Sequence, residues 1–128
     1  MAGFASKQEM EKVISKFIDL MTKTPALSIR SKGVKVSIGY EITDLDLKFH
    51  TEFMDGVVTG GLGEATPASM VILETDSETF DGMMGGELDM TSVVMSGQVS
   101  ISGDMTAAMG LQGVNDVMMD LYKQARGA

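Results

Sequence analysis

The spacing of apolar residues changes from a helical period to a strand period near residue 34 of the chain. From Ser6 to Met21, apolar side chains recur every three or four residues, and Ser6 with Glu9 forms a capping box, so we predict an amphipathic helix. From Val34 to Ile42 and again from Leu45 to Phe53, apolar and polar residues alternate. This alternation predicts two neighbouring antiparallel strands that share one apolar and one polar face.

The segments around these two strands contain turn signals. Residues 22–33, which include Pro25, predict a connection or a broken turn of helix. The pair Asp55-Gly56 predicts a tight turn into a third strand, Val57 to Leu62. The glycine-rich segment 60–68 then predicts a crossover to the run Ser69 to Leu73, which is apolar on both faces. Such a run predicts an interior strand, or a strand whose outer face is covered.

Two short helices are predicted between residues 75 and 97. Thr75 with Glu78 forms a second capping box, for a helix that ends at Gly85. Asp89 can cap another short helix that ends near Gly97.

The alternating run Gln98 to Ser102 predicts a fifth strand, and the chain after it predicts two helices rather than one. At about 100° per residue, the apolar residues of 105–112 lie on one side and those of 114–125 on another. A single straight helix cannot bury both sides. We therefore expect a helix capped by Asp104, a break near Gly110 to Gly113, and a separate helix to about Gln124.

Together these elements predict one α+β domain over residues 1–128. The chain has the length of a single domain, and its order of elements is helix, three strands, crossover, strand, helices, strand, helices. This order predicts a single, mainly antiparallel five-stranded sheet with helices covering one face.

Composition excludes several classes of function. The chain has no cysteine, which rules out disulfides, thiolate catalysis and sulfur-ligated metals. Its net charge of −8 argues against a nucleic-acid partner and against electrostatic docking on anionic lipid. No apolar run approaches the ~20 residues of a membrane span, and no secretory signal is present, so we expect a cytoplasmic protein with at most transient membrane contact.

Candidate catalytic and metal-binding patterns are weak. The only histidine, His50, alternates in phase with polar residues, which predicts a solvated strand position. Gly61-Leu62-Gly63 begins like a dinucleotide loop, but Pro67 stands where a helix should open. Residues 76–87 have the length of a calcium loop but lack its central glycine. Two carboxylate pairs are best explained as solvated acids: Asp44 with Asp46, and Asp116 with Asp120.

The segment Gly86 to Gln112, GELDMTSVVMSGQVSISGDMTAAMGLQ, contains a longer pattern in fixed register. A Gly-x-Leu opening is followed by an apolar helix that ends in glycine, an alternating strand, the triplet Gly-Asp-Met and a small-residue helix that closes in Leu-Gln. In this order it resembles the sterol carrier protein 2 family of lipid-binding domains. The preceding stretch VILETDSETFDGMMGG resembles the strand and helix that come before the motif in that family.

The resemblance implies an α+β fold whose helices enclose an apolar tunnel for a fatty acid, an acyl-CoA, a sterol or a similar lipid. It also implies that no cofactor and no covalent chemistry are involved, so that the domain is not an enzyme. Carried onto this chain, the resemblance implies that the tunnel is lined by inward residues of the matching segments: Phe80, Met83, Met84, Val94, Met95, Ile101, Met105, Ala108 and Met109.

The chain is rich in methionine, with thirteen methionines against five phenylalanines and no tryptophan. Because methionine is unbranched and flexible, it suits either a loosely specified core or a cavity whose contents vary in shape. Five of the thirteen, Met83, Met84, Met95, Met105 and Met109, are among the residues that the resemblance assigns to the tunnel, which favours the cavity interpretation.

Three functions remain open at this point. The first is a carrier that binds an apolar lipid in its tunnel and transfers it. The second is a self-associating domain with a packed core, which would form a homodimer through Met70 and Ile72 on the otherwise polar outer sheet face. The third is an accessory domain of a larger enzyme assembly that presents a lipid-like substrate.

Overall fold

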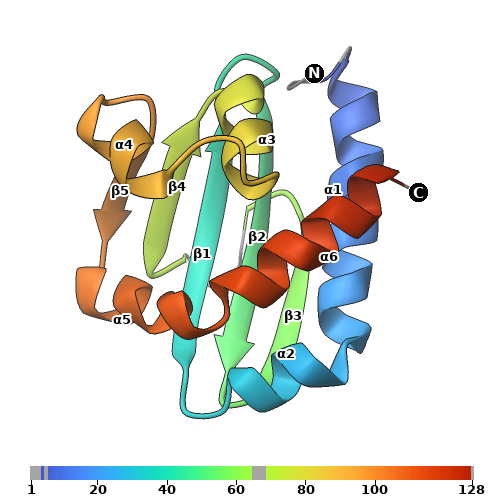
Figure 1. Cartoon of the computed structure of the whole chain (residues 1–128), viewed down its shortest axis with the longest axis vertical. Coiled ribbons are helices and arrows are strands. Elements are labelled where there is room, and N and C mark those ends of the chain that lie inside the picture. Colours follow the sequence, from blue (N-terminus) through green and yellow to red (C-terminus); the bar gives the residue numbers. More distant parts are fainter. Residues whose placement is uncertain (1–3, 5, 65–68, 128) are drawn as a thin grey trace.

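A five-stranded mixed sheet carries the helices of this protein on one of its faces (Figure 1). The computed structural model describes residues 4, 6–64 and 69–127. The spatial order of the strands is β3-β2-β1-β4-β5, and the pairing is antiparallel except between β1 and β4, which are parallel. The strands are β1 (Lys35–Ile42), β2 (Leu47–Met54), β3 (Val57–Leu62), β4 (Val71–Thr75) and β5 (Ser100–Gly103).

Two of the helices are long and the others are short. The helices are α1 (Lys7–Lys23), α2 (Pro25–Arg30), α3 (Ser77–Met84), α4 (Met90–Met95), α5 (Met105–Met109), the 3-10 turn η1 (Gly110–Gly113) and α6 (Asn115–Gly127). In Figure 1, α1 and α6 cover the half of the sheet that contains β2 and β3, whereas the short helices α4 and α5 lie over the half with β4 and β5.

The alternation in the sequence is confirmed as burial on the helix-covered face of the sheet. Val36, Ile38, Tyr40 and Ile42 of β1 are all buried, and every second residue of β2 from Leu47 onward is buried as well. The predicted strand 69–73 corresponds to β4, which is shifted to Val71–Thr75 and lies between β1 and β5, so it is an interior strand as predicted. The mainly antiparallel five-stranded α+β fold expected from the sequence is confirmed.

Three element boundaries differ from the prediction. The cap of α3 is Asp76 rather than Thr75, because the Asp76 carboxylate accepts the N–H of Thr79 at 2.7 Å. The hydroxyl of Thr75 instead donates to the carbonyl of Gln98 at 2.8 Å, so Thr75 remains part of β4. Gln98 itself precedes β5. The strand begins at Ser100 rather than at the predicted Gln98.

The start of β2 and the segment after α1 also differ. Asp46 has a φ of 50°, so the chain turns there and the strand begins at Leu47 instead of Leu45. Residues 22–33 contain a complete short helix, α2, with Pro25 at its first position, where the missing N–H costs nothing. The predicted crossover is only partly visible, since residues 65–68 lie outside the described residues.

The predicted break in the last helical segment is confirmed. Asp104 caps α5 by accepting the N–H of Ala107 at 3.0 Å, and η1 then turns the chain before α6 begins. The apolar side chains of α5 and α6 face different surroundings, as the spacing predicted. No side chain of α5 is completely buried, whereas α6 contributes to the core. The side chains of the last segment that are buried in the core are Val114, Met118, Leu121, Tyr122 and Ala125.

Five aromatic rings form a continuous contact through the core. Phe17 of α1 meets Tyr122 of α6 edge to face, with ring centroids 5.5 Å apart, and Tyr122 meets Phe80 of α3 at 5.6 Å. Phe80 in turn contacts the stacked pair Tyr40 and Phe49, which come from β1 and β2. Edge-to-face geometry places the positive edge of one ring against the negative face of the next, which adds stabilisation beyond surface burial.

A buried carboxylate fixes α3 to α6 beside these rings. Asp81 accepts a hydrogen bond from the Tyr122 hydroxyl at 2.7 Å and two from the Arg126 guanidinium at 2.8 and 3.0 Å. The guanidinium also lies over the ring of Phe4, 4.4 Å from its centroid. A buried charge needs this degree of pairing to offset its desolvation.

The two tyrosines predict an alkaline limit to stability. Burial raises the pKa of Tyr40 to about 12, and burial together with the Asp81 carboxylate raises the pKa of Tyr122 above the ordinary value. Unfolded tyrosines ionise near pH 10, so the unfolded state loses protons first and the free energy of unfolding falls as pH rises above about 10. Tyrosinate ultraviolet absorbance of Tyr122→Phe, which leaves Tyr40 as the single tyrosine, should titrate near pH 12. A midpoint near 10 in a protein that circular dichroism shows to be folded would contradict the burial of Tyr40.

Two glycines with positive φ give a matched test of the β4–β5 edge. Gly103 has a φ of 103°, and a Cβ there would overlap the carbonyl oxygen of Met70, which accepts the N–H of Asp104. Gly97 has a φ of 82° and open space around it. We expect Gly97→Ala to lower the free energy of unfolding by about 1 kcal/mol and Gly103→Ala by about 3 kcal/mol, measured by chemical denaturation. Equal losses would mean that the close approach at Gly103 is not rigid.

Candidate functional site

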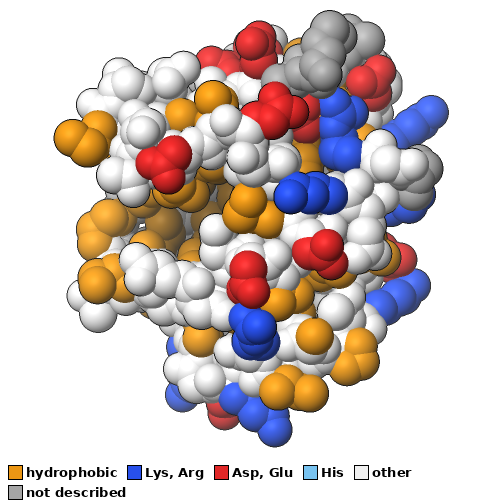
Figure 2. Space-filling model, in the orientation of Figure 1, with side chains coloured by type: hydrophobic (Ala, Val, Ile, Leu, Met, Phe, Trp, Pro, Cys, Tyr) orange, Lys and Arg blue, Asp and Glu red, His pale blue; other side chains and the backbone are white. Residues whose placement is uncertain are grey.

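An apolar hollow opens on the helix-covered side of the molecule, between the short helices (Figure 2). In the common orientation of Figures 1 and 2 it lies over β4 and β5, with α3 and α4 above it and α5 below it. The exposed large apolar side chains of these bordering segments are Leu88, Val94, Met95, Met105 and Met109, with exposed fractions from 38% to 82%. We call this feature the apolar groove and define it by these bordering segments, with their five exposed apolar side chains, over the floor described next.

The floor of the apolar groove is the inner face of the sheet at its β5 edge. Leu73 pairs with Tyr40 of β1 on one side and with Ile101 of β5 on the other, so these three side chains share one face. Leu73 is buried and Ile101 is half-buried, because no long helix covers β5. The floor therefore presents hydrocarbon toward the hollow.

Short, well-capped helices make the walls. The Asp89 carboxylate accepts the N–H of Ser92 at 3.0 Å at the start of α4, and Asp104 does the same for α5. With only six and five residues, α4 and α5 cannot bury a wide face, and Val93 is the one residue of the two helices that is fully buried. The remaining apolar side chains of α4 and α5 stay available at the hollow.

The nine residues expected to line a tunnel fall into two groups. Phe80, Met83 and Met84 of α3 are buried in the hydrophobic core, where Phe80 belongs to the aromatic contact described above. The other six come from the elements that border the apolar groove. Ile101 and Ala108 are half-buried, and Val94, Met95, Met105 and Met109 are exposed. These six residues come from α4, β5 and α5, which follow one another along the chain and border the same hollow.

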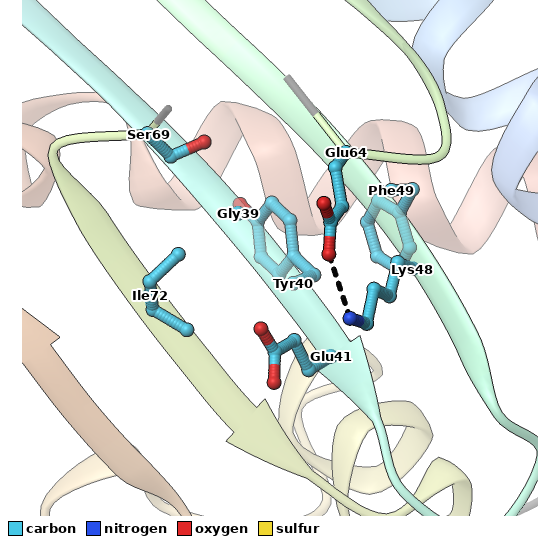
Figure 3. Close-up of a pocket in the computed structure, with 8 residues that line it drawn as sticks. All are labelled: Gly39, Tyr40, Glu41, Lys48, Phe49, Glu64, Ser69 and Ile72. Carbon is cyan, nitrogen blue, oxygen red and sulfur yellow. Dashed lines mark hydrogen bonds and ion pairs between the residues drawn. The ribbon is translucent and has the colours of Figure 1, made fainter. Parts of the chain in front are cut away.

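A second pocket, of about 200 Å³, lies on the opposite face of the sheet (Figure 3). Gly39 leaves room there for the side chain of Ile72, and Lys48 forms an ion pair with Glu64 at 2.7 Å across the opening. The hydrogen bond and the charge of Glu64 raise the pKa of Lys48, while both side chains remain in solvent. The sequence interpretation missed this pocket, and Gly39 in an otherwise alternating strand was the one available signal.

The second pocket also bears on the homodimer expected through Met70 and Ile72. Met70 is 41% exposed, whereas Ile72 is half-buried and its terminal methyl lies against Gly39. The two residues therefore form no wide apolar patch between them, and the homodimer stays a prediction.

The histidine and two of the acids singled out in the sequence make structural contacts in the described part of the chain. His50 lies on the outer sheet face, with its Nδ1 3.0 Å from the carbonyl of Gly63. Asp44 accepts two hydrogen bonds from Ser77, and Asp116 pairs with Arg30 at 2.9 Å, so these acids hold elements together and are more than solvated charges. Among residues 4, 6–64 and 69–127 no group of three acids or histidines is placed to hold a metal ion.

The sequence interpretation also missed the contact of Asp81 with Tyr122 and Arg126. A signal was present, because Asp81 interrupts the apolar face of α3 and Tyr122 and Arg126 are four residues apart on α6.

None of the described helices combines the length and the apolar character needed to cross a bilayer.

The chain is similar to proteins of known sequence and structure. It is 41% identical over 54 residues to hydroxysteroid dehydrogenase-like protein 2 of Danio rerio, and this match covers 42% of the chain but only 13% of that protein. A conserved hypothetical protein from Thermus thermophilus has the same fold, with a TM-score of 0.70 and 13% identity over 98% of this chain and 95% of that one. Palmitated SCP2L2 from Aedes aegypti shares it as well, with a TM-score of 0.56 and 15% identity over 84% and 92% of the two chains.

The family comparison covers the apolar groove completely. The model of the SCP-2 sterol transfer family matches residues 14–116, which include all five strands and the helices from α2 to η1. The resemblance seen in the sequence motif is thereby confirmed over most of the fold. The chain belongs to the SCP-2 sterol transfer family.

Proposed function

We propose that this domain binds one apolar lipid in the apolar groove and carries it without catalysing a reaction on it. The observation that carries the proposal is the exposure of Met95, Met105 and Met109 beside the half-buried Ile101. Exposed apolar side chains that gather around a hollow lose contact with water when a hydrocarbon enters. Membership of a sterol transfer family supports the same function.

The groove would contact the lipid through six of the nine expected residues: Val94, Met95, Ile101, Met105, Ala108 and Met109. Met83 and Met84 would support it from the core, together with Phe80. The flexible thioethers can follow an acyl chain or a ring system without a fixed polar match. Palmitate bound to the related Aedes aegypti protein is consistent with such a tail.

The size of the ligand follows from the cost of association. Each buried methylene contributes ~0.8 kcal/mol, and lost freedom of motion costs at least ~4 kcal/mol. Micromolar affinity needs ~8 kcal/mol, which corresponds to about 15 buried methylenes. We therefore propose a ligand with a long acyl chain or a sterol-sized ring system.

Access to the groove would come through α5 and η1. These two segments contribute no buried residue, whereas α6, which follows them, holds Tyr122 and Leu121 in the core. A lipid could displace α5 at little cost in packing, because few buried contacts are lost. The tunnel expected from the family would then form around the bound lipid.

A second candidate function is that of an accessory domain that presents a lipid-like substrate to an enzyme. The observation that favours it is the match to a dehydrogenase-like protein of which this chain spans only 13%. The two functions differ in one measurable respect. A carrier accelerates the movement of a fluorescent lipid from donor to acceptor vesicles. A presenting domain binds the lipid but does not accelerate its transfer.

Polar substitution at the groove should weaken lipid binding selectively. Replacing Met105 and Met109 by glutamine keeps side-chain length but places an amide against the hydrocarbon, so we expect about a tenfold higher Kd for hexadecanol. The measurement is displacement of the neutral dye Nile red, with native mass spectrometry of the complex.

A matched control exists on the other face of the sheet. Met54 is 45% exposed there, as Met105 is at the groove, and Met70 is 41% exposed. The double variant Met54→Gln with Met70→Gln should bind hexadecanol like the unchanged protein. If the control loses affinity and the groove variant does not, the proposed binding site is refuted. If the control alone changes the oligomeric state, the homodimer interpretation gains support instead.

A further inference from the structure

The charges of this protein are divided sharply along the chain. Residues 51–122 form a run of 72 residues without a single lysine, arginine or histidine, although they contain twelve of the eighteen acidic residues. The other 56 residues contain all ten lysines and arginines, the one histidine and only six acids.

The cation-free run builds the apolar groove. It supplies β4 and β5 of the floor, α3, α4, α5 and η1 around it, and the first two turns of α6. In Figure 2 the blue side chains of lysine and arginine lie to the right of the hollow and below it, over α1, α2 and α6. The hollow itself is bordered by apolar and acidic side chains.

The cations nearest to the groove are engaged or displaced from it. Arg30 donates to Asp116 at 2.9 Å and to the carbonyl of Gly113 at 3.3 Å, which holds it against the start of α6. Lys48 is paired with Glu64 on the opposite face of the sheet. Lys123 extends toward Gly86 at the end of α3, on the α6 side of that turn.

Three acids stand at the ends of the groove walls. Asp89 precedes α4 and Asp104 precedes α5, and the carboxylate of each caps its helix. Glu87 is exposed in the turn between α3 and α4, and within the described part of the chain its carboxylate makes no hydrogen bond or ion pair. A negative headgroup at the mouth of the groove would meet these three charges, and the nearest cation, Lys123, lies beside Gly86 on the α6 side of the turn.

We infer that the groove selects lipids by headgroup charge and takes an amphiphile whose headgroup is uncharged or cationic, in preference to an anionic one with the same tail. This inference rests on the proposed binding of a lipid in the apolar groove. One unit charge at about 8 Å in water changes an affinity about twofold, so three such acids together weaken binding of an anion about tenfold at low salt.

The test compares three ligands that have the same tail and whose headgroup is permanently negative, neutral or positive. Displacement of Nile red from the protein is measured at about 20 mM and about 500 mM salt for hexadecyl sulfate and hexadecyltrimethylammonium below their critical micelle concentrations and for hexadecanol below its solubility limit. We expect the sulfate to bind about tenfold more weakly than the alcohol at low salt and the difference to shrink at high salt. The cationic ligand should bind at least as well as the alcohol and weaken with added salt.

Two charge-reversal variants distinguish the effect of acids near the groove on ligand binding from the effect of the protein's net charge. Glu87→Lys changes the turn beside the groove, and Glu52→Lys makes the same change on the outer face of β2. We expect Glu87→Lys to improve sulfate binding about fourfold relative to the alcohol and Glu52→Lys to leave this ratio nearly unchanged. An equal effect of both variants would overturn the inference, because net charge alone would then explain the preference.

The outcomes also distinguish this inference from the proposed function. If hexadecanol binds and the sulfate binds equally well at low salt, the charge selection is refuted while lipid binding stands. If none of the three ligands displaces the dye, or if binding is insensitive to Met105→Gln with Met109→Gln, the proposed function itself fails.

Discussion

The contact of five aromatic rings is the interaction on which the rest of the fold depends. It joins α1, α6, α3, β1 and β2 through one sequence of edge-to-face and stacked rings, so that a single cluster connects both ends of the chain to the centre of the sheet. The Tyr122 hydroxyl extends the cluster to Asp81 and, through it, to Arg126. Five of the seven aromatic residues are used in this way, which concentrates rigid packing on one half of the molecule.

The other half of the sheet is covered differently, and this difference explains the groove. Once α1 and α6 have packed over β2 and β3, only helices of six and five residues remain for β4 and β5. Sealing the hollow completely would leave a dry cavity, and ~500 Å³ of rigid void would cost ~12 kcal/mol, as much as a whole domain's stability. An opening to solvent avoids that cost, because water can fill the space until a ligand replaces it.

Periodicity predicted the fold well where burial is one-sided. The alternation in β1 and β2, the interior position of β4 and the break between α5 and α6 all followed from which faces could be buried together. The sequence did not decide which residue caps a helix where two neighbouring residues can both do so. Thr75 and Asp76 are both good helix caps, and the choice was made by the carbonyl of Gln98, 23 residues away, which engages the Thr75 hydroxyl.

The candidate site was predictable only in part, for a similar reason. The motif placed Val94, Ile101 and Met105 on neighbouring elements, and the structure groups those elements around one hollow. Periodicity identifies the apolar face of α3 but does not say which neighbour that face meets, so Met83 and Met84 could not be assigned to groove or core in advance. The pocket at Gly39 depends on contacts between strands and the crossover, which a pattern along one strand does not contain.

The parallel pairing of β1 with β4 has a consequence for the order in which this protein folds. Strands β1, β2 and β3 can associate as a local antiparallel unit, but β4 joins β1 only after the crossover has been made, and the rings of the core stay incomplete until Tyr122 arrives from the last helix. Contacts between distant parts of a chain form slowly because the intervening segment must first be ordered. On the ribosome, the nascent chain would therefore expose its unfinished apolar sheet until α6 had been synthesised, which makes this interval the one in which chaperones matter most.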